Sequence, residues 1–378
     1  MGTHTAAPGR RAGDETTAVS GAGALLGAVP LPVSVTVNLT HRCNFACGMC
    51  TQYGGKFKNA TSQELSLAEW TAFFESIAWS GMRVVLFGGE PTLYPHFGEI
   101  VTQLGRLHIP FDLVTNGFFL AEHVEQLAES QARVFVSIDG PREVHNRIRH
   151  SRDSFARLEA ALRCLRPLRK NTTARPFLGI NCVMQPDNVN HLGDLLAFAM
   201  TAEPDAVSLQ HPQYSSPQLN HMTDAIWRPR LGSPYSVELL PKVAFNFDED
   251  YLRRLTRAVA TVRATYADDE RVVFLPDFDA DELRLYYSES SHFFLRPGQS
   301  CTLPWTRPTI DPNGDVSLCL DAQIGNVTTN DFWALWDSAA ARLFRRTLST
   351  LERFPVCTRC CALYVDESAA AAQEGTAR

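Results

Sequence analysis

Three cysteines near the start of the chain lie within eight residues of one another. In the segment HRCNFACGMC (41–50) they are Cys43, Cys47 and Cys50, separated by three and then two residues. A structural zinc site uses four protein ligands, and His41 is the one further Cys or His side chain nearby in the sequence. Three thiolates leave one coordination position open, which is typical of an iron–sulfur cluster with one iron that the protein does not hold. The alternative is a zinc site completed by a distant residue.

A second group of cysteines lies near the end of the chain. Its members are Cys301, Cys319, Cys357, Cys360 and Cys361. The segment 301–319 predicts a β-hairpin, because two strand-like runs flank the turn sequence DPNG. A predicted helix, 331–348, separates this hairpin from the closing CTRCC. Four thiolates hold either a zinc ion or an iron–sulfur cluster, so both interpretations are open here.

The composition is that of an ordinary globular protein. Of 378 residues, 45% are hydrophobic and 20% are charged, with a formal net charge of -6. Neither the charge nor its pattern predicts a surface for nucleic acid or anionic membrane. No apolar run approaches the roughly 20 residues of a membrane span. We therefore expect neither a nucleic-acid nor a membrane partner.

The first 32 residues contain one export-like signal, which its context argues against. Arg10 and Arg11 form an arginine pair, but Asp14 and Glu15 follow, and the next residues are mostly Ala, Gly and Val. We predict a disordered tail over 1–32 and a cytoplasmic protein.

Apolar strands alternate with helices along the next part of the chain. Strands are predicted at 33–37, 83–89, 111–117, 133–140, 177–184 and 206–211. Helices are predicted at 66–79, with a capping box from Ser66 to Glu69, and at 96–106, 119–130, 153–166 and 190–200. This alternation indicates an α/β fold with a parallel sheet covered by helices. The unit lengths favour a partial (β/α)6 TIM-like barrel over 33–211.

Four short motifs follow the predicted strands directly. They are the cysteine loop, GGEP (88–91), TNG (115–117) and SIDG (137–140). The carboxyl ends of parallel strands meet at one face of a barrel, where chemistry gathers. We therefore expect these four motifs to share one site.

With these motifs in this order, residues 33–211 resemble the radical S-adenosylmethionine (radical SAM) superfamily. The resemblance implies that Cys43, Cys47 and Cys50 hold a 4Fe-4S cluster. The open iron would chelate the amino and carboxylate groups of S-adenosylmethionine. One electron would then cleave the sulfonium and release a 5′-deoxyadenosyl radical that abstracts hydrogen from the substrate. A flavodoxin or ferredoxin is the implied electron donor.

The resemblance also assigns residues to the cosubstrate. Gly88 and Gly89 would let backbone carbonyls approach its ammonium group, and Glu90 would add negative charge there. Alone, GGEP is equally a tight turn before a helix. The remaining expected contacts are Met49 at the adenine, where the family usually has an aromatic residue, Asn116 from a strand end, Asn181 from within a strand, Ser137 at the ribose or carboxylate, and Arg149 at the carboxylate.

Two of these last assignments have plain structural alternatives. Arg149, in HNRIR, would form a charge-assisted fork on the carboxylate, but a solvated surface arginine fits the pattern too. Asn181 is also explained as a structural polar group within a strand.

Residues 301–378 resemble the twitch domain, the shortened form of the SPASM extension. IGNV (324–327) and Trp333 match that extension. The resemblance implies that Cys301, Cys319, Cys357 and Cys360 hold a second, auxiliary 4Fe-4S cluster. Cys361 would replace Cys360 or stay free.

The segment 212–300 is predicted to be a linker or substrate-binding insertion. It opens with a long ordered loop and continues with a helix (249–266), a strand (271–276) and a helix (279–288). Three of its aromatic residues either contact substrate or pack on the barrel: Tyr214, Trp227 and Tyr235.

The predicted activity is that of a radical SAM oxidoreductase. An auxiliary cluster that takes the second electron favours a two-electron oxidation. Epimerisation is the redox-neutral alternative, and it would need a hydrogen donor such as Cys182 or Cys361, although Cys164 and Cys182 also fit as ordinary core residues. Because only a short tail precedes the first strand, we expect a small-molecule substrate such as a sugar or aminocyclitol. The alternatives are a maturase of ribosomally made peptides and a non-enzymatic, zinc-stabilised binding protein.

Overall fold

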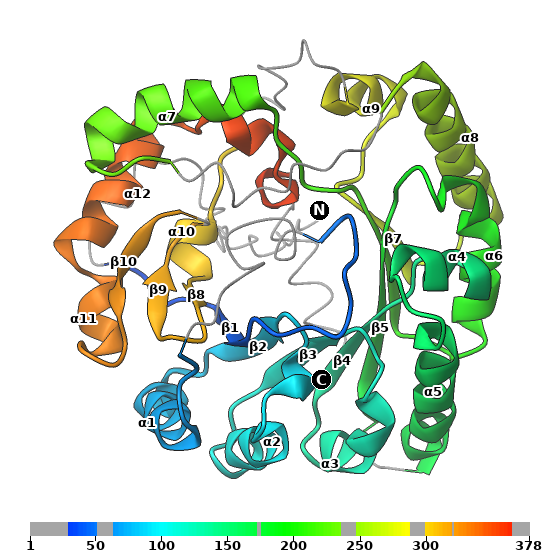
Figure 1. The fold of residues 1–378 in the computed structure, drawn as a ribbon, viewed down its shortest axis with the longest axis horizontal. Helices are drawn as coiled ribbons and strands as arrows, with labels where there is room; N and C mark the ends of the chain where they lie inside the picture. Colours follow the sequence, from blue (N-terminus) through cyan, green and yellow to red (C-terminus); the bar gives the residue numbers. More distant parts are fainter. Residues whose placement is uncertain are drawn as a thin grey trace, which may run out of the picture.

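A single sheet organises the protein. The computed structural model describes residues 29–50, 63–171, 175–235, 247–287, 299–319 and 321–364. In these residues ten strands form one sheet in the order β10-β9-β8-β1-β2-β3-β4-β5-β6-β7. Figure 1 shows the strands curving around the centre of the molecule, with α1, α2, α3, α5, α6 and α8 on the outside.

The parallel strands confirm the predicted partial barrel. They are β1 (Ser34–Thr40), β2 (Arg83–Gly88), β3 (Phe111–Thr115), β4 (Arg133–Ser137), β5 (Phe177–Val183), β6 (Ala206–Gln210) and β7 (Val272–Leu275). Each of these strands pairs in parallel with the next. The strand expected at 271–276 is therefore part of the core sheet and does not belong to a separate insertion.

Helices cover the outer face of the sheet. They are α1 (Leu67–Ile77), α2 (Phe97–Arg106), α3 (Val124–Glu129), α5 (Ser154–Asn171), α6 (Leu192–Met200) and α8 (Glu249–Thr265), with α4 (Arg142–Ile148) and α9 (Ala280–Tyr287) nearer the strand ends. The predicted capping box is confirmed, since the Ser66 side chain accepts from the Glu69 N–H and the Glu69 carboxylate accepts from the Ser66 N–H.

Alternation along each strand separates a helix-facing side from the lumen. In β2, Val84 and Leu86 are fully buried against the helices. Arg83 and Val85 point the other way and line a hollow of about 210 Å³, which also includes Asn181 of β5. The lumen is therefore partly polar.

Charged side chains form the floor of this lumen. Asp112 Oδ1 lies 3.0 Å from Arg83 Nη1 and 3.5 Å from Arg133 Nε. Arg307 Nε donates to Ser34 Oγ at 2.9 Å. Burial raises the pKa of Asp112, while the charges of Arg133, Arg83 and Arg307 oppose that rise. This network links β1, β2, β3 and β4 below the mouth.

The loop expected at the start of 212–300 is in fact helical. Helix α7 (Pro217–Leu231) begins with Ser216 as N-cap, whose side chain accepts from the Leu219 N–H. Proline in the first turn favours a helix start, because the missing N–H would have no partner there. Pro, Ser and aromatic residues in this segment therefore mark a capped helix.

Two of its three aromatic residues serve packing. Trp227 and Tyr235 are buried, and the ring of Trp227 packs on Phe344 of α12 (Ala339–Leu351) and on Phe354. Tyr214 is half-buried, and its ring stacks on Tyr287. The segment 212–300 thus divides, with α7 packing on the C-terminal region and α8 with β7 completing the barrel.

The C-terminal region extends the same sheet. Its elements are α10 (Leu303–Thr306), β8 (Thr309–Ile310), β9 (Asp315–Ser317), β10 (Gln323–Asn326), α11 (Phe332–Trp336) and α12 (Ala339–Leu351), followed by the 3-10 turns η5 (Pro355–Arg359) and η6 (Cys361–Leu363). The predicted hairpin is β8 and β9, and β8 pairs in parallel with β1. The helix expected at 331–348 is broken at Asp337, because Ser338 caps a new helix with its side chain.

The predicted tail over 1–32 lies mostly outside the described residues. Residues 29–32 are described, and the Pro30 carbonyl accepts a 2.9 Å hydrogen bond from Trp336 Nε1. This part of the expected tail is therefore fastened to α11. Among the described residues, no helix is long and apolar enough to cross a membrane.

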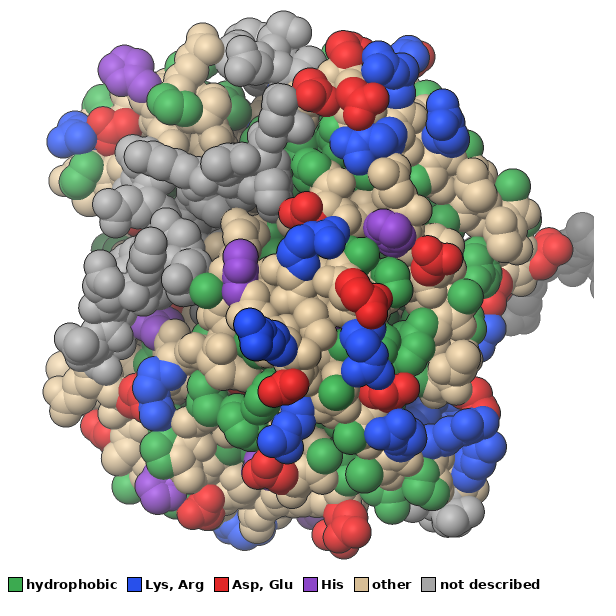
Figure 2. Space-filling view, turned by 45° about the vertical axis from the view of Figure 1, so that its right-hand side comes forward, with side chains coloured by type: hydrophobic (Ala, Val, Ile, Leu, Met, Phe, Trp, Pro, Cys, Tyr) green, Lys and Arg blue, Asp and Glu red, His purple; other side chains and the backbone are tan. Residues whose placement is uncertain are grey.

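The visible surface carries both signs of charge. Figure 2 shows Lys and Arg side chains interspersed with Asp and Glu on the face that it presents. Surface pairs such as Arg166 with Glu203 and Arg254 with Asp250 contribute to this mixture. This face offers no single basic patch of the kind that nucleic acid requires.

The floor network yields a stability prediction. Asp112→Asn removes the one carboxylate shared by Arg83 and Arg133, so we expect a loss of about 1–3 kcal/mol in the free energy of unfolding. Urea denaturation measures it. Glu75→Gln is the control, because the pair of Glu75 with Arg106 is more than half exposed on both sides and is expected to contribute little. Equal midpoints for the two variants would contradict a structural role for the floor.

Candidate active site at the barrel mouth

The cysteine loop leaves β1 at the mouth of the barrel. Cys43 Sγ accepts hydrogen bonds from the Phe45 N–H at 3.4 Å and from Asn116 Nδ2 at 4.0 Å. The Cys50 N–H donates to the Cys47 carbonyl at 3.1 Å, which closes a tight turn between two of the thiols. Cys47 is buried and Cys50 is half-buried.

An apolar shell surrounds this loop. The cluster contains Phe45, Cys47, Met49, Val144 and Ile148, with Cys50, Phe118 and Val183 packed against it. Phe45 and Phe118 meet edge to face, with ring centroids 5.7 Å apart. Met49 is buried in this shell, at the position expected near adenine. Such a shell limits water around a bound metal centre.

The thiols lie close enough to affect one another. Cys43 keeps an exposed surface, but partial desolvation raises the pKa of its thiol. The Phe45 N–H lowers this pKa, and the charges of Glu90, Cys47 and Cys50 raise it. Burial raises the pKa of Cys47 to about 11, although Arg149 lowers it. A sulfur-only donor set in an apolar shell fits an iron–sulfur cluster.

Gly88 and Gly89 bring the end of β2 against the start of the cysteine loop. A Cβ on Gly88 would lie 2.4 Å from the Thr40 carbonyl oxygen, and one on Gly89 would lie 2.2 Å from that of Arg42. The N–H groups of Gly89 and Glu90 donate to those same two carbonyls, both at 2.8 Å. The two glycines therefore allow the end of β2 to approach the backbone of the cysteine loop closely. Their approach to the ammonium group of a cosubstrate stays a prediction.

The Glu90 carboxylate points toward the end of β3, whereas we expected it to face the ammonium group of the cosubstrate. It accepts from Thr115 Oγ1 at 2.7 Å and from the Asn116 N–H at 2.8 Å, and it also accepts from the N–H and hydroxyl of Thr92. The residue is 1% exposed, and burial raises its pKa while these hydrogen bonds lower it. Glu90 thus joins the ends of β2 and β3, and in this structure its carboxylate does not face the open mouth.

Of the other predicted residues, Asn116 reaches the cysteine loop at the mouth. Asn116 donates to Asn44 Oδ1 at 2.9 Å as well as to Cys43, so the TNG motif contacts the cysteine loop. Ser137 and Asn181 lie opposite each other in the register of β4 and β5. Asn181 also lines the hollow in the lumen. Their contacts to a cosubstrate stay predictions.

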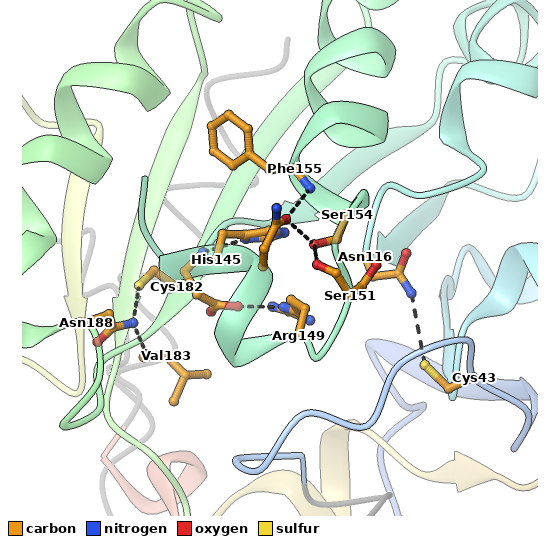
Figure 3. A network of polar contacts seen from close by, with 12 residues as sticks. Cys43, Asn116, His145, Arg149, Ser151, Ser154, Phe155, Cys182, Val183 and Asn188 are labelled. Atoms are coloured by element: carbon orange, nitrogen blue, oxygen red, sulfur yellow. Dashed lines mark hydrogen bonds and ion pairs between the residues drawn. The ribbon is translucent and has the colours of Figure 1, made fainter. Parts of the chain in front are cut away.

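Arg149 is not a surface arginine. It is 9% exposed, and its Nε lies 2.5 Å from Asp139 Oδ2. The charge of Arg149 also lowers the pKa of Cys47. Figure 3 shows Arg149 at the end of α4, with His145 one helical turn earlier. The sequence singled out Arg149 but did not reveal its pairing with Asp139. The i, i+4 spacing in HNRIR does indicate that His145 and Arg149 share a face.

Cys182 lies on the wrong side of β5 for a hydrogen donor. It is fully buried in the core, and it accepts a hydrogen bond from Asn188 Nδ2 at 3.5 Å (Figure 3). Because side chains alternate along a strand, Cys182 faces the helices while Asn181 faces the lumen. Cys182 is therefore a core residue, as the alternative interpretation had it. Cys164, which was also expected in the core, is exposed.

The C-terminal cysteines also come together. Burial raises the pKa of Cys357, and the nearby charges of Cys319 and Cys301 raise it further. The charges of Cys319, Cys357 and Cys360 all act on buried Tyr235. These four cysteines fit an auxiliary iron–sulfur cluster by donor type. The side chain of Cys361 lies outside the described part of the structure.

Two contacts that the sequence did not reveal join this cysteine group to the barrel. Gln213, just beyond β6, donates to Cys360 Sγ at 3.6 Å. The Tyr286 hydroxyl lies 2.9 Å from the Pro212 carbonyl oxygen and 3.0 Å from that of Arg359. Within the described residues, no three His, Cys, Asp or Glu side chains are spaced to hold a single metal ion.

Comparisons with known proteins agree with this geometry. The model of the radical SAM superfamily matches residues 37–199, and that of SPASM, an iron–sulfur cluster-binding domain, matches residues 301–361. PqqA peptide cyclase of Gluconobacter oxydans is 27% identical over 331 residues, which is 84% of this chain and 80% of that protein. A probable GTP 3′,8-cyclase of Methanopyrus kandleri is 30% identical over 240 residues, which is 61% of this chain and 73% of that protein.

A solved structure shares the fold. Streptococcus suis SuiB bound to its precursor peptide SuiA aligns with a TM-score of 0.58 at 17% identity, covering 83% of this chain and 66% of that chain. SuiB bound to S-adenosylmethionine gives a TM-score of 0.56, also at 17% identity, covering 83% of this chain and 68% of that chain.

The glycine contacts yield a prediction for metal content. Gly89→Ala places a methyl group against the Arg42 carbonyl and should displace the cysteine loop, at a cost of about 1–3 kcal/mol. We expect less iron per chain after anaerobic reconstitution and a lower melting temperature. Gly48→Ala is the matched control, because that position lies inside the loop and has open space around it. Full iron loading of the Gly89 variant would show that the close contact between the end of β2 and the cysteine loop is not needed for cluster binding.

Proposed function

Because this chain belongs to the radical SAM superfamily, we propose that it is an enzyme that modifies a peptide substrate. Its cofactors are a 4Fe-4S cluster and S-adenosylmethionine, with auxiliary iron–sulfur chemistry in the SPASM domain. The observation that carries the catalytic part is the loop of Cys43, Cys47 and Cys50, which lies at the barrel mouth in an apolar shell.

Support for a peptide substrate comes from the relatives. The similarity to PqqA peptide cyclase extends over 84% of this chain, so it includes both the barrel and the C-terminal region. This favours the peptide alternative over the small-molecule substrate expected from the sequence. The GTP cyclase relative keeps a small-molecule reaction as the competing candidate.

Each group of residues has a part in the proposed reaction. When bound, the cofactors supply an electron and a 5′-deoxyadenosyl radical that removes hydrogen from the substrate. Cys43, Cys47 and Cys50 hold the cluster, and Phe45 and Met49 exclude water around it. Asn116 and Glu90 fix the loop against β3.

The C-terminal cysteines complete an oxidation. Cys301, Cys319, Cys357 and Cys360 would hold an auxiliary cluster, which could supply the acceptor for the second electron because such clusters span roughly -700 to +450 mV. The reaction is then dehydrogenation or cross-linking. Gln213 and Tyr286 connect the chain around Cys360 to the end of β6. A flavodoxin or ferredoxin in the cytoplasm supplies the first electron.

One assay tests the substrate class. Purified enzyme is incubated anaerobically with dithionite, S-adenosylmethionine and deuterated candidate substrates, both precursor peptides and small molecules. We expect deuterium in 5′-deoxyadenosine and a loss of two hydrogens only with a peptide. Label transfer from a nucleotide or sugar, with none from peptides, would overturn the peptide assignment and leave the radical chemistry intact.

Cysteine variants separate the two metal sites. We expect Cys47→Ala to abolish 5′-deoxyadenosine formation, because one cluster ligand is lost. Cys319→Ala should lower iron from about eight to about four atoms per chain. It should also reduce peptide turnover while some uncoupled cleavage remains.

The control for both variants is Cys164→Ala, since Cys164 is exposed and remote from either cysteine group in sequence. Iron analysis and chromatography of 5′-deoxyadenosine measure all three proteins. Full coupled turnover in Cys319→Ala would remove the auxiliary site from the mechanism.

A further inference from the structure

We infer that the floor of the lumen is a binding subsite for a carboxylate, and that this carboxylate belongs to an acidic residue of the substrate peptide. It lies between Arg83 and Arg307 at the amino ends of the strands, opposite the cysteine loop. The peptide part of the inference rests on the proposed function. The carboxylate site itself rests on the residues that line the hollow.

Two arginines face this end of the hollow with donors to spare. Arg83 Nη1 lies 3.0 Å from Asp112 Oδ1, and Arg307 Nε donates to Ser34 Oγ at 2.9 Å. Within the residues that the structure describes, Arg83 Nη2 and both Nη atoms of Arg307 make no hydrogen bond. Because Ser34 and Arg83 are register partners in β1 and β2, the two guanidinium groups share one end of the hollow. Such forks match the two oxygens of a carboxylate.

The charge at this end is positive. Asp112 is the one carboxylate among the described residues that line the hollow, and it is shared with Arg133, whose Nε lies 3.5 Å away. The Arg133 guanidinium lies over the ring of Phe177, 4.6 Å from its centroid, at the wall of the lumen. The charges of Arg133, Arg83 and Arg307 all act on Asp112. One carboxylate cannot neutralise three guanidinium groups, so the floor favours an anion.

The middle of the hollow is apolar. Val85, Val114 and Phe135 line it. The ring of Phe135 lies against Gly179, where a Cβ would be 2.3 Å from Phe135 Cδ1. An inorganic anion would leave this apolar surface exposed to water, whereas the aliphatic stem of an acidic side chain would cover it. The anion at the floor therefore carries an organic body.

The upper part of the hollow is polar again. Asn181, Ser208 and Gln210 line it, and Gln210 Nε2 donates to Ser208 Oγ at 3.2 Å. In the described part of the chain, the Asn181 side chain makes no hydrogen bond. Side-chain amides and hydroxyls both donate and accept, as binding to backbone amides requires. The order of charge, apolar wall and amides matches an acidic residue within a peptide.

The size of the hollow limits how much of a peptide it holds. Its volume is about 210 Å³, below the roughly 300 Å³ at which pockets for drug-sized ligands begin. Asp112 is level with Phe177 in the register, and the strand rises roughly 13 Å from there to Asn181. An arginine and a glutamate side chain, extended toward each other, cover that length. The hollow therefore receives one acidic side chain.

The test measures binding without turnover. Reconstituted holoenzyme with S-adenosylmethionine is titrated by calorimetry, at low ionic strength, with N-acetylglutamate methylamide, a single blocked glutamate. The control ligand is the corresponding blocked glutamine, which has the same shape and no charge. We expect the blocked glutamine to bind about tenfold more weakly, because hydrogen bonds to a charged group are the stronger ones.

Variants of the floor give effects of opposite sign. Arg307→Gln should weaken binding of the blocked glutamate about threefold and leave the blocked glutamine unchanged. The effect is moderate because Arg307 is exposed and solvent screens its charge. Asp112→Asn should tighten binding of the blocked glutamate, because it removes the competing carboxylate. A loss of structure would weaken binding in both variants.

Arg106→Gln is the matched control. Arg106 lies on α2 outside the barrel, and its side chain and that of its partner Glu75 are more than half exposed. We expect this variant to bind the blocked glutamate as the wild type does.

Three results would overturn the inference. Equal affinity of the wild type for the two blocked residues would mean that no carboxylate is recognised. An equal loss of affinity for both ligands in Arg307→Gln would indicate a structural effect. Tighter binding of inorganic phosphate than of the blocked glutamate, lost in Arg307→Gln, would make the floor a site for free anions.

Failure of this inference is separable from failure of the proposed function. If the blocked residues bind equally while a peptide transfers deuterium to 5′-deoxyadenosine, the carboxylate site is wrong and the peptide function stands. If the blocked glutamate binds through Arg307 but only a small molecule transfers deuterium, the carboxylate site stands and the peptide assignment is wrong.

Discussion

The whole mouth of the barrel depends on one backbone crossing, where the end of β2 rests on the chain that leaves β1. Gly89 and Glu90 donate from their N–H groups to the carbonyls of Thr40 and Arg42, and no side chain fits between the two segments. The crossing sets the direction in which the cysteine loop starts. It also buries Glu90, whose carboxylate then fixes Thr115 and Asn116 at the end of β3. Three strand ends are thereby held around the thiols.

The two cysteine groups belong to one continuous framework. β8 pairs with β1, so the C-terminal region is built onto the strand that carries the first three cysteines. At the opposite end of the sheet, Gln213 and Tyr286 connect the chain after β6 to Cys360 and Arg359. Electron transfer between two metal centres depends on a fixed separation. A sheet fastened at both edges provides that fixed separation better than a flexible linker would.

Local patterns allowed most of the fold to be predicted, and long-range partners account for the failures. The six strands and the capping box at Ser66 follow from periodicity and turn chemistry within a few residues. The alternation that turns Asn181 to the lumen turns Cys182 toward the helices, so the sequence alone already favoured the core alternative for Cys182. The directions of Glu90 and Arg149 could not be predicted, because each is decided by a partner that only the fold brings near. These partners are Asn116 for Glu90 and Asp139 for Arg149.

The pairing of β8 with β1 has a consequence for the newborn polypeptide. β1 is synthesised well before Thr309–Ile310, the strand that covers its outer edge. An uncovered strand edge is a template for aggregation. The edge of the nascent barrel must therefore stay unprotected until β8 has been synthesised, and a chain that stops before β8 would keep that edge open.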